Sequence, residues 1–192
     1  MTGRTHDLAA FTALTYTIII THPSPQMTYA TFLIAFSANM IGGLAPDIDQ
    51  PTADLWRRLP AGTVWGKILA PLLGGHRFIS HSIIGIIFFG LLIDFLLETT
   101  KSFIIADMSI VWWAFMIGYV SHLITDTFTR DGVPWLFPIP IKFGIPPIRA
   151  LRFKTGGLIE KYIIFPGLML LNGYLFYTYR SVFLELFRTA IK

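Results

Sequence analysis

Residues 79–97, ISHSIIGIIFFGLLIDFLL, decide the fold class of this chain. Apart from His81 and Asp94 the stretch has no ionisable side chain, and its apolar residues form one block rather than an amphipathic pattern. An α-helix needs about 20 predominantly apolar residues to cross the hydrocarbon core of a bilayer. We therefore expect a membrane-spanning helix here, with Ser80 as its N-cap.

The composition of the whole chain also indicates a membrane protein. Its 192 residues are 54% hydrophobic and 14% charged, with a mean hydropathy of +0.62, whereas a soluble domain has about 25% charged residues. So few charged groups cannot cover a water-exposed surface, which excludes a soluble globular protein. The net charge of +4 comes from scattered basic residues, which argues against a nucleic-acid partner. The absence of cysteine excludes disulfides and thiolate metal ligands.

Four further apolar blocks complete a predicted bundle of about five membrane-spanning helices. We expect these helices at residues 8–20, 28–45, 103–124 and 162–179. Residues 131–154 contain five prolines, which predict an interfacial or re-entrant segment rather than a continuous helix. The last span and an amphipathic surface tail lie within residues 160–192. The sequence thus predicts a single all-α integral membrane domain over residues 1–192.

Basic residues are distributed unevenly between the two ends of the predicted bundle. Eleven of the fifteen Lys and Arg residues fall on the side of the N-terminus, which also carries the loops 47–76 and 126–161. Because basic loops remain in the cytoplasm, this side is expected to face the cytoplasm. The sequence therefore predicts a multi-pass protein of the inner or plasma membrane.

Histidines and closely spaced carboxylates gather at the span ends on this cytoplasmic side. The candidate metal ligands are His6, Asp47, Asp49, His76, His81, His122 and Asp126. His122 and Asp126 are four residues apart, so they share one face of a helix. Imidazole and carboxylate groups together bind divalent cations, and zinc, manganese and iron all accept such ligands. We therefore predict a metal site at the cytoplasmic membrane face, with room for about one to three ions.

Each candidate ligand also has a purely structural interpretation. A single histidine at a helix end is more often a surface or capping residue, and His22 fits that description. The pair His122 and Asp126 is also consistent with an ordinary structural contact. Unrelated polar residues would be expected at both ends of the bundle, however, and the other four histidines lie at one end. This joint placement favours the metal site.

The motifs that carry these residues resemble those of a known family. They are Thr5-His6, Gly43-Leu44-Ala45-Pro46-Asp47-Ile48-Asp49, His76-Arg77-Phe78-Ile79-Ser80-His81-Ser82 and His122-Leu123-Ile124-Thr125-Asp126-Thr127. Their order and side, over about residues 5–135, resemble the YdjM-type, LexA-regulated inner-membrane proteins, which are described as membrane-bound metal-dependent hydrolases. That family is distantly similar to zinc-dependent phospholipases C. The resemblance implies zinc as the metal and a lipid phosphoester as the substrate.

A lipid phosphohydrolase or phospholipase C-like reaction gives the candidate residues expected roles. A metal-activated water would attack the phosphoester bond, with Asp49 or Asp126 as general base. Arg77 would bind the anionic group of the substrate, and its alternative role is a positive anchor at the cytoplasmic face. Ser82 or Thr127 would donate hydrogen bonds around the ligands. Membrane lipids are the expected partners, entering beside the proline-rich segment.

Two other classes of function are consistent with a metal site in a membrane protein. A metal transporter or sensor without hydrolysis predicts ionisable residues deep within the spans, where the sequence offers few polar residues beyond Asn39 and Asp94. A bundle stabilised by a structural metal requires no open coordination position, whereas a catalyst does. The concentration of ligands at one end of the bundle favours the enzyme.

Overall fold

The computed structural model describes residues 1–22, 27–58, 60–72, 77, 79–139 and 141–190. Across these ranges the chain is helical and contains no β-strand, and two isolated β-bridges are its only extended pairings. The prediction of an all-α fold is therefore confirmed.

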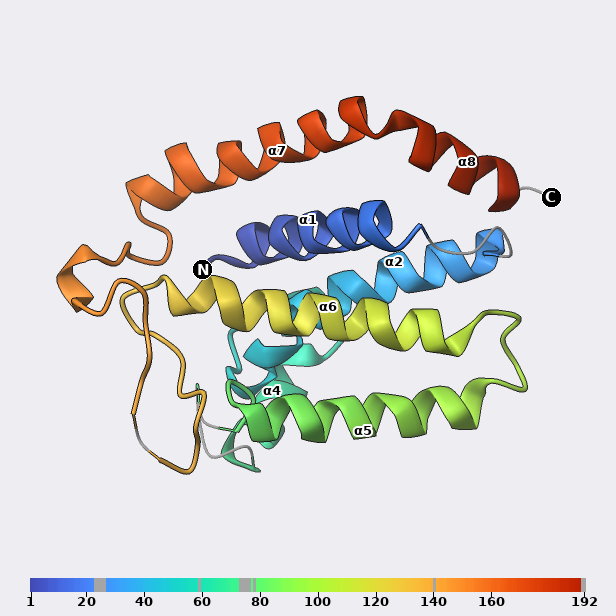
Figure 1. Cartoon of the computed structure of the whole chain (residues 1–192). Helices are drawn as coiled ribbons and strands as arrows, with labels where there is room; N and C mark the ends of the chain where they lie inside the picture. The colour runs from blue at the N-terminus through green and yellow to red at the C-terminus, as the bar shows by residue number, and fades with distance from the viewer. Residues whose placement is uncertain (23–26, 59, 73–76, 78, 140, 191–192) are drawn as a thin grey trace.

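Five long helices form the bundle, and shorter helices connect and flank them (Figure 1). The long helices are α1 (Gly3–Thr21), α2 (Tyr29–Leu44), α5 (Ile83–Thr100), α6 (Met108–Thr127) and α7 (Phe165–Thr178). The shorter α-helices are α3 (Asp54–Arg58), α4 (Gly62–Leu72) and α8 (Arg180–Ala190). The remaining elements are the 3-10 helices η1 (Ala45–Asp49) and η2 (Arg149–Leu151) and the π-helix η3 (Glu160–Ile164).

Three segments of the described chain are long and apolar enough to cross a membrane. They are α2 continued by η1, α5, and α6. The first and fifth predicted spans also form helices, α1 and η3 with α7, but neither combines the length and the hydropathy of a candidate span. Threonines lower the hydropathy of α1, and the hydroxyls of Thr12, Thr17 and Thr21 donate to carbonyls one turn earlier. That α1 and α7 also cross the membrane stays a prediction, as does the cytoplasmic orientation.

Capping residues fix where the spanning helices begin. The Thr28 hydroxyl accepts a hydrogen bond from the N–H of Thr31 and starts α2, as expected. For α5 the prediction of Ser80 as N-cap is wrong, because Ser82 accepts from the N–H of Gly85 instead. Helix α6 starts five residues later than predicted, since the Asp107 carboxylate caps it.

Helix α6 lies in the middle of the bundle, against α1, α2 and α5 (Figure 1). Its contact with α2 is close because glycines line it. A Cβ atom on Gly118 would lie 2.2 Å from the carbonyl oxygen of Asn39, and one on Gly42 would lie 2.1 Å from that of Phe115. Small residues of this kind let two membrane helices approach at backbone distance. One turn beyond Gly118, the same contact brings His122 against the end of α2.

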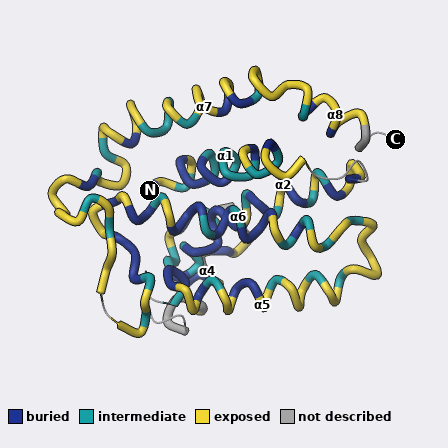
Figure 2. Tube along the Cα trace, in the orientation of Figure 1, coloured by how far each residue is buried: buried dark blue, intermediate teal, exposed yellow. Residues whose placement is uncertain are grey.

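Burial follows this arrangement (Figure 2). Buried residues concentrate on α6 and on the facing sides of α1 and α2, around a core that includes Phe115, Tyr119 and Leu123. Helices α5 and α7 bury few residues and expose large apolar side chains. This pattern suits a bundle whose outer helices face lipid rather than water.

The proline-rich segment forms no continuous helix, as predicted. Over residues 128–139 and 141–157 it consists of turns and irregular chain, the short helix η2 and two β-bridges. Arg152 donates to the carbonyls of Pro146 and Pro147 at 2.7 and 2.8 Å and so fixes the fold of the segment. The predicted surface tail, α8, packs on the bundle through Phe187, whose ring lies 5.4 Å from that of Phe32.

Candidate metal centre

Four parts of the chain meet at one end of the bundle and bring the predicted ligands together. His6 lies in the first turns of α1, Asp47 in η1, His81 just before α5, and His122 and Asp126 at the end of α6. The N-terminus, the end of α6 and the start of α5 lie at the same end in Figure 1. The three imidazoles and Asp126 are buried, while 20% of the Asp47 side chain is exposed.

Two overlapping groups of three side chains have the spacing of metal ligands. The first group is His6, Asp47 and His122, and the second is His81, His122 and Asp126. Within each group the ligand atoms lie within 4.8 Å of one another. His122 belongs to both groups and is therefore at the centre of the candidate site.

A backbone contact sets the tautomer of His122. Its Nδ1–H donates to the carbonyl oxygen of Gly43 at 2.7 Å, which leaves the lone pair on Nε2. That Nε2 atom lies 3.6 Å from Oδ1 of Asp47 and 3.9 Å from Oδ2 of Asp126. A neutral imidazole with its lone pair directed at carboxylates is the form that binds a metal.

The side chain of Thr125 sets the tautomer of His6 in the same way. The Thr125 hydroxyl donates to the carbonyl of His122 at 2.9 Å, so its oxygen is available to accept from the Nδ1–H of His6 at 3.1 Å. The Nε2 atom of His6 then faces Oδ1 of Asp126 at 3.3 Å. The rings of His6 and His122 stack with centroids 3.6 Å apart, which fixes their relative orientation.

His81 is oriented by the residue before it. The Ser80 hydroxyl donates to the carboxylate of Asp49, so its oxygen can accept from the Nδ1–H of His81 at 3.0 Å. The Nε2 atom of His81 lies 3.6 Å from Oδ1 of Asp47 and 3.9 Å from Oδ2 of Asp126. The Nε2 atoms of His81 and His122 thus both face Asp47 and Asp126, and that of His6 faces Asp126.

These donors fit a divalent cation. Separations of 3.6 to 3.9 Å between His122 or His81 and the carboxylates are too long for hydrogen bonds. Two donors on a tetrahedral zinc ion, each about 2.1 Å from the metal, lie roughly 3.4 Å apart. The buried Nε2 atom of His122 has no hydrogen-bond partner among the described residues. The nitrogen and oxygen donors suit zinc, manganese or iron alike.

Asp49 lies outside both ligand groups and supports the His81 segment. Its Oδ2 atom accepts from the backbone N–H of Arg77 at 2.8 Å and from the Ser80 hydroxyl. Arg77 adopts a left-handed backbone with φ of 64°, a conformation that costs a non-glycine residue about 1 kcal/mol or more. Asp49 therefore holds the strained turn that places His81.

Arg77 points into the site from this turn. Its guanidinium forms an ion pair with Asp126 and donates to the carbonyl of Gly132 at 2.9 Å. The amino group of Met1 also contacts Asp126. Arg77 thus lies at the edge of the donor set, and its guanidinium already contacts Asp126 and the Gly132 carbonyl. Its role in binding substrate stays a prediction. The predicted ligand His76 lies outside the described residues.

The residues predicted to donate hydrogen bonds around the ligands, Ser82 and Thr127, donate to backbone carbonyls rather than to the histidines. Residues two positions earlier in the chain contact the histidines. Ser82 caps α5, and the Thr127 hydroxyl donates to the carbonyl of Leu123 at 2.8 Å. Ser80 and Thr125 orient the histidines instead. The sequence could not separate these neighbours, because the choice depends on the residue at which each helix begins or ends.

Glu160 is a buried carboxylate whose role is not apparent from the sequence. Its Oε1 atom accepts from the N–H of Thr2 at 2.7 Å and from the Thr2 and Thr5 hydroxyls at 2.8 and 2.7 Å, and Oε2 accepts from the N–H of Gly156 at 2.8 Å. Burial acts to raise the pKa of Glu160, but these hydrogen bonds outweigh it and hold the pKa below its ordinary value. Glu160 therefore ties the first turn of α1, next to His6, to the start of η3.

Comparison with known proteins identifies the family. The family model described as "YdjM inner membrane protein" matches residues 1–187. The chain belongs to the YdjM family. This confirms the resemblance and extends it beyond the motif-bearing residues 5–135. With the three candidate spans, membership in this family shows a protein of the membrane.

Curated relatives from Bacillus subtilis, Escherichia coli and Shigella flexneri are similar to the chain. The uncharacterized protein YvsG of Bacillus subtilis is 30% identical over 177 residues, which are 92% of this chain and 95% of YvsG. The inner membrane protein YdjM of Escherichia coli is 34% identical over 121 residues, which are 62% of this chain and 56% of YdjM, and the protein of the same name from Shigella flexneri gives the same values. No solved structure matches the chain. The similarity of the family to phospholipases C stays a prediction.

Proposed function

We propose that this protein is a membrane-bound metal-dependent hydrolase that cleaves a phosphoester bond of a lipid. One observation carries the proposal: three buried imidazoles are each held through Nδ1, with Nε2 of His81 and His122 facing Asp47 and Asp126 and Nε2 of His6 facing Asp126. A purely structural cluster has no need to fix the same tautomer three times. A metal site requires it, because each ligand must offer an unprotonated nitrogen.

The ligand groups determine how many ions the centre would take. His6, Asp47 and His122 would hold a cation in one group, and His81, His122 and Asp126 in the other. A single Nε2 lone pair binds one cation, so the two groups compete for His122. One tightly held ion is therefore expected, and a second would depend on the remaining donors. When bound, a divalent cation lowers the pKa of a coordinated water and polarises a phosphoryl oxygen.

The side chains around the donors would supply the rest of the chemistry. Asp47 is the more exposed of the two facing carboxylates, so a substrate would reach it first. Asp126 is buried beside the donors and, where it does not ligate the ion, is the candidate general base. Arg77 places a guanidinium beside Asp126, where an anionic phosphoester would be neutralised.

The position of the centre supports a lipid substrate. His122 and Asp126 lie in the last turns of α6, and Asp47 lies in η1 at the end of the segment that α2 begins. The ends of spanning helices lie at the level of lipid headgroups, where phosphoester groups are found. A centre at this depth would reach a headgroup while the hydrocarbon chains remain in the bilayer.

A metal-binding membrane protein without hydrolysis is the second candidate. The near-complete burial of His6, His81, His122 and Asp126 favours it, because structural metal sites are closed. The two candidates differ in whether a substrate reaches the ion. Only the enzyme predicts release of product from a lipid.

Elemental analysis and a lipid assay on detergent-purified protein test the proposal. We expect about one equivalent of zinc, manganese or iron in the wild type, its loss in His81→Ala and Asp47→Ala, and its retention in His22→Ala. His22 serves as the matched control because it ends α1 at the opposite end of the bundle. Metal-dependent release of phosphate from phosphatidic acid, or of phosphocholine from phosphatidylcholine, would support the hydrolase. Metal retention without either product would favour the second candidate, and a metal-free wild type that takes up no zinc or manganese would overturn both.

A further inference from the structure

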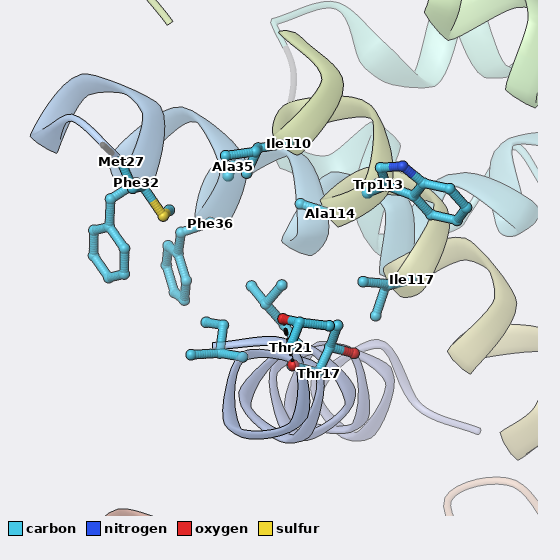
Figure 3. Close-up of a pocket in the computed structure, with 12 residues that line it drawn as sticks. Thr17, Thr21, Met27, Phe32, Ala35, Phe36, Ile110, Trp113, Ala114 and Ile117 are labelled. Atoms are coloured by element: carbon cyan, nitrogen blue, oxygen red, sulfur yellow. Dashed lines mark hydrogen bonds between the residues drawn. The ribbon is translucent and has the colours of Figure 1, made fainter. Parts of the chain in front are cut away.

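Two adjoining apolar cavities run along one face of α6. The first, of about 490 Å³, lies between α1, α2 and α6 and is lined by residues that include Thr17, Phe36, Trp113 and Ile117 (Figure 3). The second, also of about 490 Å³, lies between α1, α5 and α6. Trp113 and Ile117 line both cavities, so the two adjoin along the helix, and we refer to them together as the groove.

The groove leads towards the candidate metal centre. Its α6 residues are spaced by three or four and therefore form a stripe on one helix face: Ile110, Trp113, Ile117, Val120 and Ile124. The stripe rises roughly 21 Å along the helix axis. It ends next to Thr125, the residue that orients His6. One end of the groove thus adjoins the metal ligands.

Several residues of the groove carry a hydroxyl or an indole N–H, but these polar groups already form hydrogen bonds within the protein. The Thr17 and Thr21 hydroxyls donate to carbonyls of α1 itself at 2.9 and 2.8 Å. The Ser121 hydroxyl donates to the carbonyl of Gly118, and the Trp112 indole donates to the carbonyl of Gly90. Since these groups are already used within the protein, the groove selects an apolar occupant.

The depth of the groove indicates what that occupant is. Helices α2, α5 and α6, which wall it, are the three candidate membrane-spanning helices. At this depth the surrounding medium is hydrocarbon, and one leaflet contributes about 15 Å of it. A groove roughly 21 Å long therefore accommodates a full lipid chain lying parallel to α6.

We propose that this groove binds a hydrocarbon chain of the lipid whose phosphoester is placed at the His/Asp centre. The inference rests on the proposed function and adds a substrate-selecting element to it. The groove fixes the lipid by its chain, and the chain end nearest Ile124 delivers the headgroup to His6 and Asp126. Selection by chain length and bulk then occurs at Ile117, where the two cavities join.

Photolabelling in a bilayer tests this proposal. The protein is placed in phosphatidylglycerol nanodiscs containing phosphatidic acid with a diazirine at mid-chain, and labelled residues are located by mass spectrometry. We expect label on residues 110–124 of α6 and on the facing residues of α1. The substitution Ile117→Trp adds bulk where the cavities join and is expected to reduce this label about tenfold. The matched control Leu91→Trp adds similar bulk on α5 at a position that is 67% exposed, and it should leave the label unchanged.

Each remaining outcome separates the alternatives. Label spread over α5 as densely as over the α6 stripe, or unaffected by Ile117→Trp, would overturn the groove. If Ile117→Trp fails to fold, Ala13→Phe narrows the second cavity from α1 and carries the same expectation. Absence of groove label in a wild type that retains metal-dependent hydrolysis overturns the groove alone. Specific label in a protein that neither retains metal nor hydrolyses lipid overturns the proposed function alone.

Discussion

The Nε2 atom of His122 lies 3.6 Å from Oδ1 of Asp47, although the two residues belong to different helices and are far apart in the chain. The Nδ1–H of the same ring donates to Gly43, at the end of the helix that leads to Asp47. One contact between α2 and α6 therefore sets both the protonation and the direction of the central imidazole. The chemistry of the candidate centre depends on how these two helices pack.

Replacing His122 should weaken metal binding more than replacing either other imidazole. His122 belongs to both ligand groups, whereas His6 and His81 belong to one each. We expect His122→Ala to lower metal affinity by about 100-fold or more, and His6→Ala by roughly tenfold. Competition with a chromophoric chelator measures both affinities. Equal losses in the two variants would contradict the central position of His122.

The sequence alone predicted which helix ends would meet. The alternation of apolar blocks places His6, His81 and Asp126 on one side of a membrane, and the structure brings these residues together. This prediction was within reach because apolar length and block order are properties of the sequence. The tautomer of His81 was not, because it depends on whether Ser80 or Ser82 caps the helix.

Glu160 shows a second limit of the sequence. It is separated from Thr2 and Thr5 by almost the whole chain, yet it accepts hydrogen bonds from both. Several carboxylates lie near predicted span ends, and their apolar neighbours do not reveal which one returns to the first helix. Burial of a carboxylate with four donors is visible only in three dimensions.

Removing the Thr125 hydroxyl should weaken the centre without removing a ligand. In Thr125→Val the Nδ1–H of His6 loses its acceptor, so the ring is free to change tautomer or orientation. We expect metal affinity to fall about tenfold. The control is Thr21→Val, since the Thr21 hydroxyl donates within α1 at the far end of that helix. The same affinity in both variants would show that His6 needs no such support.

Glu160 should act on the metal centre through His6. In Glu160→Gln an amide nitrogen replaces one carboxylate oxygen, so an acceptor of the Thr2, Thr5 or Gly156 hydrogen bonds is lost. We expect metal affinity to fall, and we expect that fall to disappear when His6→Ala is already present. This double-mutant cycle distinguishes positioning of His6 from general destabilisation, which would persist in both backgrounds.

The same residue predicts a dependence of stability on pH. Because the folded pKa of Glu160 is lowered, ionised Glu160 favours the folded state above its ordinary pKa. That contribution is lost as the pH falls through the lowered pKa. The difference in thermal stability between wild type and Glu160→Gln should thus be largest near neutral pH and shrink in acid. A difference that stays constant from pH 7 into acid would contradict the assignment.

Glycine at position 118 should be required for both folding and metal binding. A Cβ atom there would lie 2.2 Å from the carbonyl oxygen of Asn39, so Gly118→Ala forces α2 and α6 apart. The separation moves the Gly43 carbonyl away from Nδ1 of His122 and releases the ring. We expect a lower melting temperature together with reduced metal content. Gly173→Ala is the matched control, because nothing lies within 4 Å of a Cβ atom there. Retention of full metal affinity in a destabilised Gly118→Ala would show that the helix contact does not orient His122.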